Sequence, residues 1–275
     1  GKPEFMKAGY EAQLKSIVLL KNKGQVLPIE KKKTVFIPPV YRPAAKNWWN
    51  QWTEPTLENP ANEELVKQYY HLTNQPQEAD FAIVFVSSPQ SENGGYSPED
   101  RQSGGNGYVP IPLQYNPYTA TDARENSLAA GDPVTDPEIS HRSYKNKSTR
   151  TLNAGDLDVL LKTRKMMGNK PVIAVIDLSN PMIFNEFEKE MDAIVIRFGS
   201  SIQSVLDIIA GKQEPSGLLP LQMPANMRVV EKQNEDVPFD MECHKDTEGN
   251  RYDFAFGLNW KGIIQDNRTV KYGKH

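Results

Sequence analysis

Four ionisable residues that could carry out chemistry lie close together in residues 77–115. They are two glutamates, Glu92 and Glu99, and the adjacent pair Asp100-Arg101, set in a polar stretch that is rich in glycine. Paired carboxyl groups can divide acid, base and nucleophile roles across a bond that is to be broken. A solvated loop without a function can have the same composition, so the position of the stretch in the fold decides between the two interpretations.

The residues just before the two glutamates predict where this polar stretch lies in the fold. Residues 81–86 read Phe-Ala-Ile-Val-Phe-Val, an uncharged run that is rich in β-branched and aromatic residues. Such a run is typical of a strand that is buried on both faces of a parallel sheet. Ligands of open α/β sheets bind outside the carboxyl ends of the strands, which is where the glutamates follow.

Aromatic residues form the second chemical feature of the chain. Trp48, Trp49 and Trp52 lie in a segment, residues 39–60, that contains too much proline for long regular structure. Aromatic rings pack on the apolar faces of sugars, and glycoside hydrolysis requires two carboxyl groups on either side of the scissile bond. The glutamates and the tryptophans together satisfy half of that requirement. The long region 88–153, with its several tyrosines, is expected to be an ordered functional insertion.

Alternating apolar patterns predict the elements that position these residues. Helices are expected at 3–22, 63–72, 155–167, 181–190 and 202–210, and strands at 34–38, 81–86, 171–178, 193–198 and 218–223. This alternation predicts an α/β fold with a doubly wound, mostly parallel sheet, an α/β sandwich of flavodoxin-like layers. Residues 1–224 are expected to form this domain. Residues 225–275 are expected to be an irregular extension that packs on it, with one apolar patch at 252–260.

Several classes of function are disfavoured by composition and motif. The net charge of −3 offers no footprint for nucleic acid, and no apolar run reaches the ~18 residues of a membrane span. A single cysteine, Cys243, and four histidines at no ligand spacing predict no metal site. No dinucleotide or phosphate-binding loop and no G-x-S-x-G motif is present, so no cofactor is expected, and a flavodoxin-like cofactor binder is disfavoured.

Six phrases of the chain resemble glycoside hydrolase family 3, in the domain that follows the catalytic barrel of that family. They occur in the family's order over nearly all of the chain: SIVLLKN (16–22) with VLP (26–28), AD (79–80) before an apolar strand, KPVIAV (170–175), MDAI (191–194), EPSGLLP (214–220) and YDFAFGL (252–258). The long inserts resemble a β-glucosidase subgroup that is common in Bacteroidetes.

The resemblance implies a retaining, exo-acting β-glucosidase that removes terminal glucose from a β-glucoside or β-gluco-oligosaccharide. In that family the nucleophilic Asp comes from the barrel domain, whose motifs are missing from this sequence. The barrel, on the same or a separate chain, is therefore the expected partner, and this chain alone is expected to be inactive. A periplasmic or secreted location is expected. The rival hypothesis is a free-standing, non-catalytic carbohydrate-binding or assembly module.

The resemblance also implies roles for individual residues. Its second domain supplies the general acid/base Glu from the loop after its second strand, and Glu92 is favoured because glycines follow it as in the family phrase. Glu99, just before Asp100-Arg101, is the alternative. The loop of Trp48, Trp49 and Trp52 matches the region that contacts the leaving-group sugar. Substrate contacts are also expected from Tyr96 and Arg101.

Overall fold

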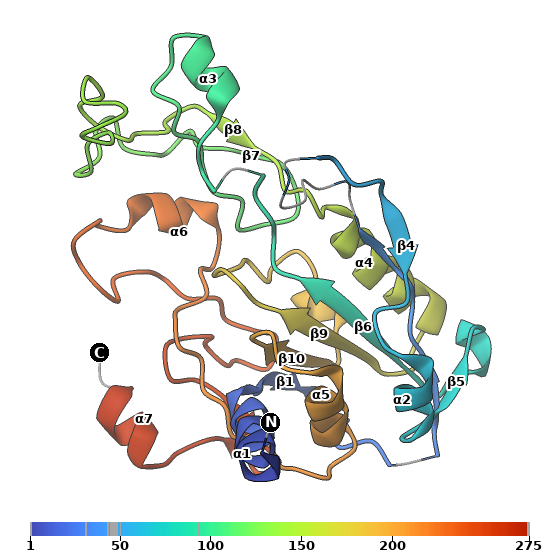
Figure 1. Cartoon of the computed structure of the whole chain (residues 1–275). Helices are drawn as coiled ribbons and strands as arrows, with labels where there is room; N and C mark the ends of the chain where they lie inside the picture. The colour runs from blue at the N-terminus through green and yellow to red at the C-terminus, as the bar shows by residue number, and fades with distance from the viewer. Residues whose placement is uncertain are drawn as a thin grey trace.

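The computed structural model describes residues 2–30, 32–42, 44, 49, 51–92 and 94–273. Its centre is an eight-stranded sheet with the order β12-β11-β1-β10-β9-β6-β2-β5 (Figure 1). These strands are β1 (Val18–Asn22), β2 (Thr34–Phe36), β5 (His71–Thr73), β6 (Phe81–Ser87), β9 (Val172–Asp177), β10 (Ala193–Arg197), β11 (Leu258–Asn259) and β12 (Gly262–Ile263).

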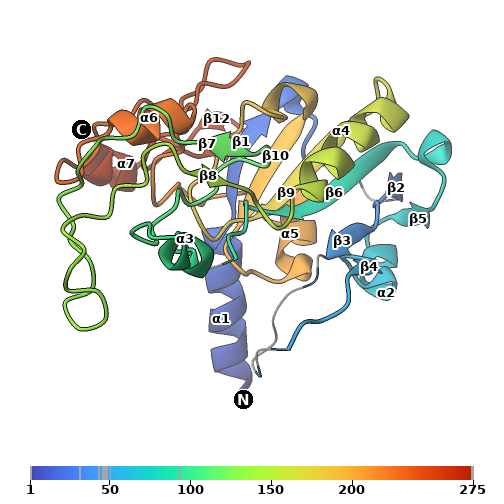
Figure 2. The ribbon, with the colours of Figure 1, turned by 90° about the horizontal axis from the view of Figure 1, so that it is seen from above.

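Helices cover both faces of this sheet, as Figure 2 shows for α4 on one face and for α1 and α5 on the other. The helices are α1 (Pro3–Ser16), α2 (Glu63–Lys67), α3 (Pro98–Gln102), α4 (Gly155–Met167), α5 (Ile202–Ile209), α6 (Met227–Lys232) and α7 (Asn267–Tyr272). Short 3₁₀ helices are η1 (Lys23–Gln25), η2 (Pro76–Glu78) and η3 (Glu188–Glu190). Two small hairpins pair β3 (Val40–Arg42) with β4 (Thr56–Glu58) and β7 (Tyr118–Thr119) with β8 (Ser148–Thr149).

The sheet is parallel from β10 to β5 and antiparallel where β1, β11 and β12 join it. Its central strands β6, β9 and β10 are buried along almost their whole length, which is why their sequences are continuous apolar runs. The α/β class, the mostly parallel sheet and the flanking helices are confirmed. In the described part of the chain, no helix combines the length and the hydropathy that crossing a membrane would need.

The expected helix 3–22 is wrong in its second part. Helix α1 ends at Ser16, and residues 18–22 form β1, which pairs antiparallel with β10. The side chains of Ile17 and Val18, expected on one apolar face of that helix, are fully buried, as are those of Leu19 and Leu20. Four consecutive apolar residues satisfy a doubly buried strand better than one face of a surface helix.

Two further expected elements are wrong. Residues 181–190 contain only the turn η3, because Met182, Ile183 and Phe184 are buried in the core and the Ile183 amide donates to Leu113 O at 2.8 Å. Residues 218–223 form no strand, because their amides pair irregularly with the C-terminal segment, as Leu219 N does with Phe256 O at 2.8 Å. The sheet is instead completed by β11 and β12 from that segment.

Three further segments differ from their predicted secondary structure. The expected helix 63–72 stops at Lys67, and its end becomes the parallel edge strand β5 beside β2. Region 88–153, expected to be long and irregular, carries α3 and the β7-β8 hairpin. The C-terminal extension, expected to be irregular, carries α6 and α7.

Candidate functional site

The glutamate loop begins where the sheet presents its parallel carboxyl ends. Ser87, the last residue of β6, is the register partner of Asp177, the last residue of β9. The amide of Ser88 then donates to Asp177 O at 3.0 Å, and its hydroxyl lies 3.0 Å from that of Ser179. The loop therefore leaves the sheet at the place where ligands of open α/β sheets bind.

A buried polar network holds the base of this loop. The Gln90 amide donates to the Thr151 hydroxyl at 2.8 Å and to Asn153 Oδ1 at 2.9 Å. Asn153 Nδ2 donates to Ser87 O at 3.1 Å and to Asp156 Oδ2 at 2.9 Å. Thr151, Asn153 and Asp156 are buried, and burial raises the pKa of the Asp156 carboxyl above its usual value. Residues 87–90 are thus fixed by a network with satisfied hydrogen bonds.

Glu92 lies beyond this fixed base, on the exposed part of the loop. Among the described residues, none donates a hydrogen bond or forms an ion pair with its carboxylate. Gly94 and Gly95 follow with φ of 60° and 92°, a region that costs glycine little and other residues more. The turn then returns the chain to the fold, where Val109 N donates to Gly95 O at 2.9 Å. Glu92 is therefore an accessible carboxylate on a short, anchored turn.

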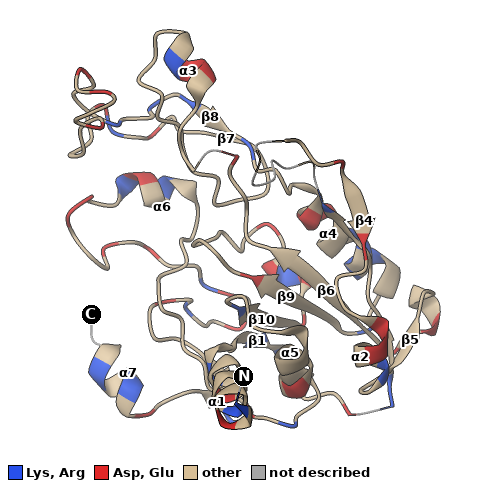
Figure 3. Cartoon of the chain, in the orientation of Figure 1, with Lys and Arg blue, Asp and Glu red and all other residues tan. Residues whose placement is uncertain are grey.

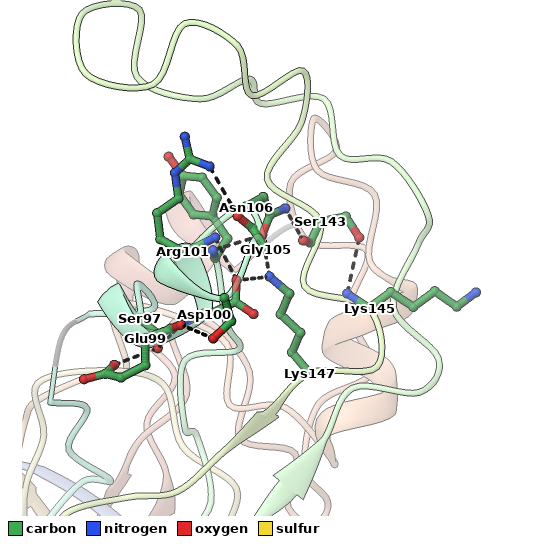
Figure 4. Close-up of polar contacts among 12 residues, drawn as sticks. Ser97, Glu99, Asp100, Arg101, Gly105, Asn106, Ser143, Lys145 and Lys147 are labelled. Carbon is green, nitrogen blue, oxygen red and sulfur yellow. Dashed lines mark hydrogen bonds and ion pairs between the residues drawn. The ribbon is translucent and has the colours of Figure 1, made fainter.

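Glu99 occupies a different setting, in the first turn of α3 (Figure 4). Ser97 caps this helix by accepting from the Asp100 amide at 3.1 Å, and its hydroxyl donates to the exposed Glu99 carboxylate at 2.9 Å. A carboxylate in the first turn is favoured by the dipole of the helix. The position of Glu99 therefore has a structural explanation, whereas no hydrogen bond or ion pair within the described part of the chain explains that of Glu92.

The neighbours of Glu99 in α3 tie this helix to the rest of the insert. Asp100 forms an ion pair of 2.5 Å with Lys147 and accepts from the Gly107 amide at 2.8 Å. Arg101 pairs with Asp136 at 3.3 Å and with Glu138. Figure 3 accordingly shows both charge signs on α3. The guanidinium of Arg101, for which a substrate contact is predicted, is engaged within the insert here.

Tyr96 and Tyr108 form a ring pair beside the glutamate loop. Their centroids are 5.6 Å apart in an edge-to-face arrangement, and the two residues form an isolated β-bridge. Gly107 makes this contact possible, because a Cβ at its position would lie 2.4 Å from the Tyr96 ring. The half-buried Tyr96 thus packs within the insert, and its predicted substrate contact stays a prediction.

The tryptophan segment also comes near the glutamate loop. Trp49 and Trp52 expose 76% and 57% of their surface, while Trp48 lies outside the described residues. A pocket of about 360 Å³ brings the end of this segment, Thr53 and Glu54, together with Gln90 and Asn153. The structure therefore brings Thr53 and Glu54, which follow Trp52, to the base of the glutamate loop. The sugar contacts expected of the tryptophans stay a prediction.

A second pocket, of about 410 Å³, lies on the Gly94–Gly95 side of the loop. Its walls are mostly apolar and include Tyr108, Val109, Ile111, Leu113, Met227 and Val230. The last two come from α6, some 130 residues along the chain from Gly94–Gly95, and sequence reasoning missed them. No local pattern marks Met227 and Val230 as site residues, because they join the pocket only through tertiary packing. Among the residues that the structure describes, no cluster of three His, Cys, Asp or Glu could hold a metal ion.

Comparison with curated proteins finds relatives that are much longer than this chain. The probable beta-glucosidase C of Aspergillus flavus is 24% identical over 262 residues, 94% of this chain and 30% of that protein. The beta-glucosidase C of Emericella nidulans is 24% identical over 242 residues, which are 88% of this chain and 29% of that protein. The putative beta-xylosidase of Formosa agariphila is 25% identical over 260 residues, which are 92% of this chain and 31% of that protein. The chain thus spans about 30% of the length of these curated relatives.

Solved structures agree on the fold. The beta-glucosidase D2-BGL from Chaetomella raphigera has a TM-score of 0.51 at 18% identity, over 94% of this chain and 36% of that one. The exo-1,3/1,4-beta-glucanase ExoP from a Pseudoalteromonas species has a TM-score of 0.51 at 17% identity, over 97% of this chain and 38% of that one. The profile of the glycosyl hydrolase family 3 C-terminal domain matches residues 17–260. The chain therefore belongs to the C-terminal domain family of the family 3 glycosyl hydrolases.

Proposed function

We propose that this chain is the second domain of a retaining, exo-acting β-glucosidase and supplies the general acid/base to a site shared with a barrel domain. The observation that carries the proposal is the position of Glu92, an exposed carboxylate on the loop after β6, at the carboxyl edge of the sheet in a family 3 C-terminal domain. The names of the curated relatives include beta-glucosidases, which supports glucosides as the substrate class.

The proposed reaction divides the two steps of retaining hydrolysis between the domains. A barrel Asp attacks the anomeric carbon, while Glu92 donates its proton to the oxygen of the departing group as the glycosidic bond breaks. Glu92 then removes a proton from the water that hydrolyses the glucosyl-enzyme ester, which regenerates both carboxyl groups. An exposed carboxylate that accepts no hydrogen bond from the described residues suits this role better than one that is bonded at the start of a helix.

Contacts to the leaving group are proposed for the tryptophan segment. Trp49 and Trp52 are large aromatic residues with most of their surface exposed, and Thr53, the residue after Trp52, lines the pocket that reaches Gln90. Exposed aromatic surface of this kind marks interaction sites, and aromatic rings stack on sugar faces. One of these rings is proposed to hold the leaving-group sugar and the other to pack against the barrel.

Azide rescue in the enzyme with its barrel tests the acid/base assignment. Glu92→Ala should slow hydrolysis of substrates with poor leaving groups by about 10²–10⁴-fold, the usual contribution of general acid–base catalysis. Azide should restore turnover of activated aryl glucosides, because the small anion attacks the glucosyl-enzyme without needing a base. Glu99→Ala is the matched control and should leave both rates near those of the unmodified enzyme. Rescue of Glu99→Ala together with no rescue of Glu92→Ala would reverse the assignment.

A further inference from the structure

We propose that the docking of the insert, residues 88–153, on α6 depends on pH through one buried carboxyl group, that of Glu231. The contact is tight while this carboxyl group is neutral, and it loosens when the group ionises. The inference is separate from the acid/base assignment, since Glu231 has no part in the proposed reaction.

Glu231 lies in α6 and faces the insert from a buried position. It is 5% exposed, and α6 lies beside the β7-β8 hairpin of the insert (Figure 2). The Tyr118 hydroxyl and the Asp122 amide, both in the insert, lie near its carboxylate. In the described part of the chain, neither of its two oxygens has a hydrogen bond of normal geometry. Buried carboxyl groups in this state are uncommon in native proteins.

The arginines closest to Glu231 in the chain and across the contact are paired with other carboxylates. Arg228 pairs with Asp122 at 2.6 Å, and Arg124 pairs with Glu235 at 3.4 Å. Among the residues that the structure describes, no basic side chain lies within ion-pair distance of Glu231. Burying an unpaired charge is costly, so a carboxylate in this position takes up a proton instead.

A cavity of about 60 Å³ lies between α6 and the insert, with Glu231 in its wall. Small-molecule sites have about 300–1,000 Å³, so this cavity has no room for a ligand that could neutralise the carboxylate. Two guanidinium groups in its wall repel a metal cation. Charged and titratable groups face Glu231 from α6, from the loop after it and from the insert: Arg228, Glu235, Tyr118, Asp122, Arg124, Arg142 and Tyr144.

The direction of the pH dependence follows from this burial. Burial raises the pKa of Glu231 above 4.5, and the Tyr118 hydroxyl and the Asp122 amide lower it without reversing the shift. When the insert undocks, the carboxyl group is exposed and its pKa returns to about 4.5. Above pH 4.5 the docked state therefore holds a proton that the undocked state releases. Docking is strongest below that pH and weakens as pH rises toward the pKa of the docked state.

The same contact shapes the pocket beside the glutamate loop. Arg142, Tyr144 and Val230 line both the small cavity and the pocket of about 410 Å³. Loosening of the contact therefore moves walls of that pocket. Any effect of this movement on catalysis rests on the proposed function, whereas the pH dependence of docking does not.

Hydrogen exchange of α6 across pH tests the inference on the 275-residue chain. A helix of six residues is not stable in water by itself, so the protection of its amides reports whether α6 is docked. The Gln233 amide donates to Val229 O at 3.1 Å. After correction for the intrinsic exchange rate, its protection should fall at least about 10-fold from about pH 5 to about pH 8, which corresponds to one unit of pKa shift or more. Amides of β9 report global unfolding and should not follow this fall.

Variants at position 231 remove the proposed switch. Glu231→Gln keeps the shape of the side chain without its charge, so the protection of the Gln233 amide should become equal at both pH values. Glu231→Met is a second test, because replacing a buried polar group by an apolar one of similar shape can be neutral or stabilising. Glu235→Gln is the matched control, since it removes a carboxylate of the same cavity that is paired with Arg124, and it should keep the fall.

A histidine of the insert would produce the opposite result. His141 Nδ1 accepts from the Ser143 amide at 3.2 Å, so its protonation would loosen the insert as pH drops. An undiminished fall in both variants of Glu231, or no fall in the unmodified chain, would overturn the inference. Either outcome leaves the acid/base assignment intact, because azide rescue of Glu92→Ala is measured independently of the insert.

Discussion

At the scale of single residues, the most unusual environment is a cluster of buried polar groups around Lys21. Lys21 Nζ is fully buried and pairs with Glu188 Oε1 at 2.5 Å. Burial alone would raise the pKa of Glu188, but hydrogen bonds from Lys21 and Thr247 outweigh it and hold this pKa below 4.5. His244 Nε2 lies 3.9 Å from the second oxygen of Glu188. The cluster joins β1, η3 and the C-terminal segment, so it stabilises the attachment of that segment to the sheet.

The buried histidine makes the stability of this cluster depend on pH. Burial lowers the pKa of His244 below 6.5; Lys21 lowers it further, while Glu188 and Asp246 raise it without reversing the shift. Below pH 6.5 the unfolded chain therefore binds a proton that the folded chain does not. The free energy of unfolding should fall as pH drops from about 7 to about 5, with a share of up to about 1.4 kcal/mol per pH unit from this residue. The stabilising share of Glu188 is lost only below pH 4.5, outside this window.

Chemical denaturation across this pH window measures the share of His244. His244→Gln should flatten the slope of unfolding free energy against pH, because the residue that takes up the proton is gone. His71→Gln, at an exposed position on β5, is the matched control and should keep the slope of the unmodified chain. An equal slope in His244→Gln and in the unmodified chain would contradict the prediction.

At the scale of elements, the glutamate loop is positioned by the segment that leads into α4 rather than by its own sequence. Asn153 bonds both the loop base and Asp156, so its replacement affects two buried groups at once. Asn153→Ala should lower the free energy of unfolding by about 1–3 kcal/mol, the usual cost of leaving buried polar groups unsatisfied. It should also speed hydrogen exchange at the amide of Gln90, which loses one of its two acceptors.

Thermal melting and amide exchange check this prediction. Asn116→Ala removes a side-chain bond of 2.7 Å to Glu186 at an exposed site, and should cost far less stability. Unchanged exchange at Gln90 in Asn153→Ala would mean that the loop base is held mainly by Thr151.

At the scale of the whole molecule, the proposed active site is divided between this chain and a barrel. A retaining mechanism requires a second carboxyl group about 5–5.5 Å from the acid, which is assigned to the barrel. The purified 31.0 kDa chain alone should therefore not hydrolyse p-nitrophenyl β-glucoside above the buffer rate. Intact mass measured on the assayed sample shows whether a second chain is present. Activity from the lone chain would place both carboxyl groups within it and exclude the barrel from the chemistry.

The sequence alone determined the helices and strands whose formation depends on residues that are neighbours in the chain. The strand at 81–86 and the helices at 155–167 and 202–210 were predicted within a residue or two, because unbroken apolar runs and terminal glycines act over short distances. Family phrases identified the family, whose match covers residues 17–260, and they favoured Glu92 over Glu99 as the acid/base, which stays a prediction.

Tertiary structure alone decided the elements and contacts whose causes lie far along the chain. Whether residues 17–20 continue a helix or enter the sheet depends on β10, which lies about 175 residues further along the chain. The apolar pocket likewise exists only because α6 packs beside the glycine turn after Glu92. A pattern in one segment records how buried that segment is but not which distant segment buries it, and that pairing is settled only when the chain folds.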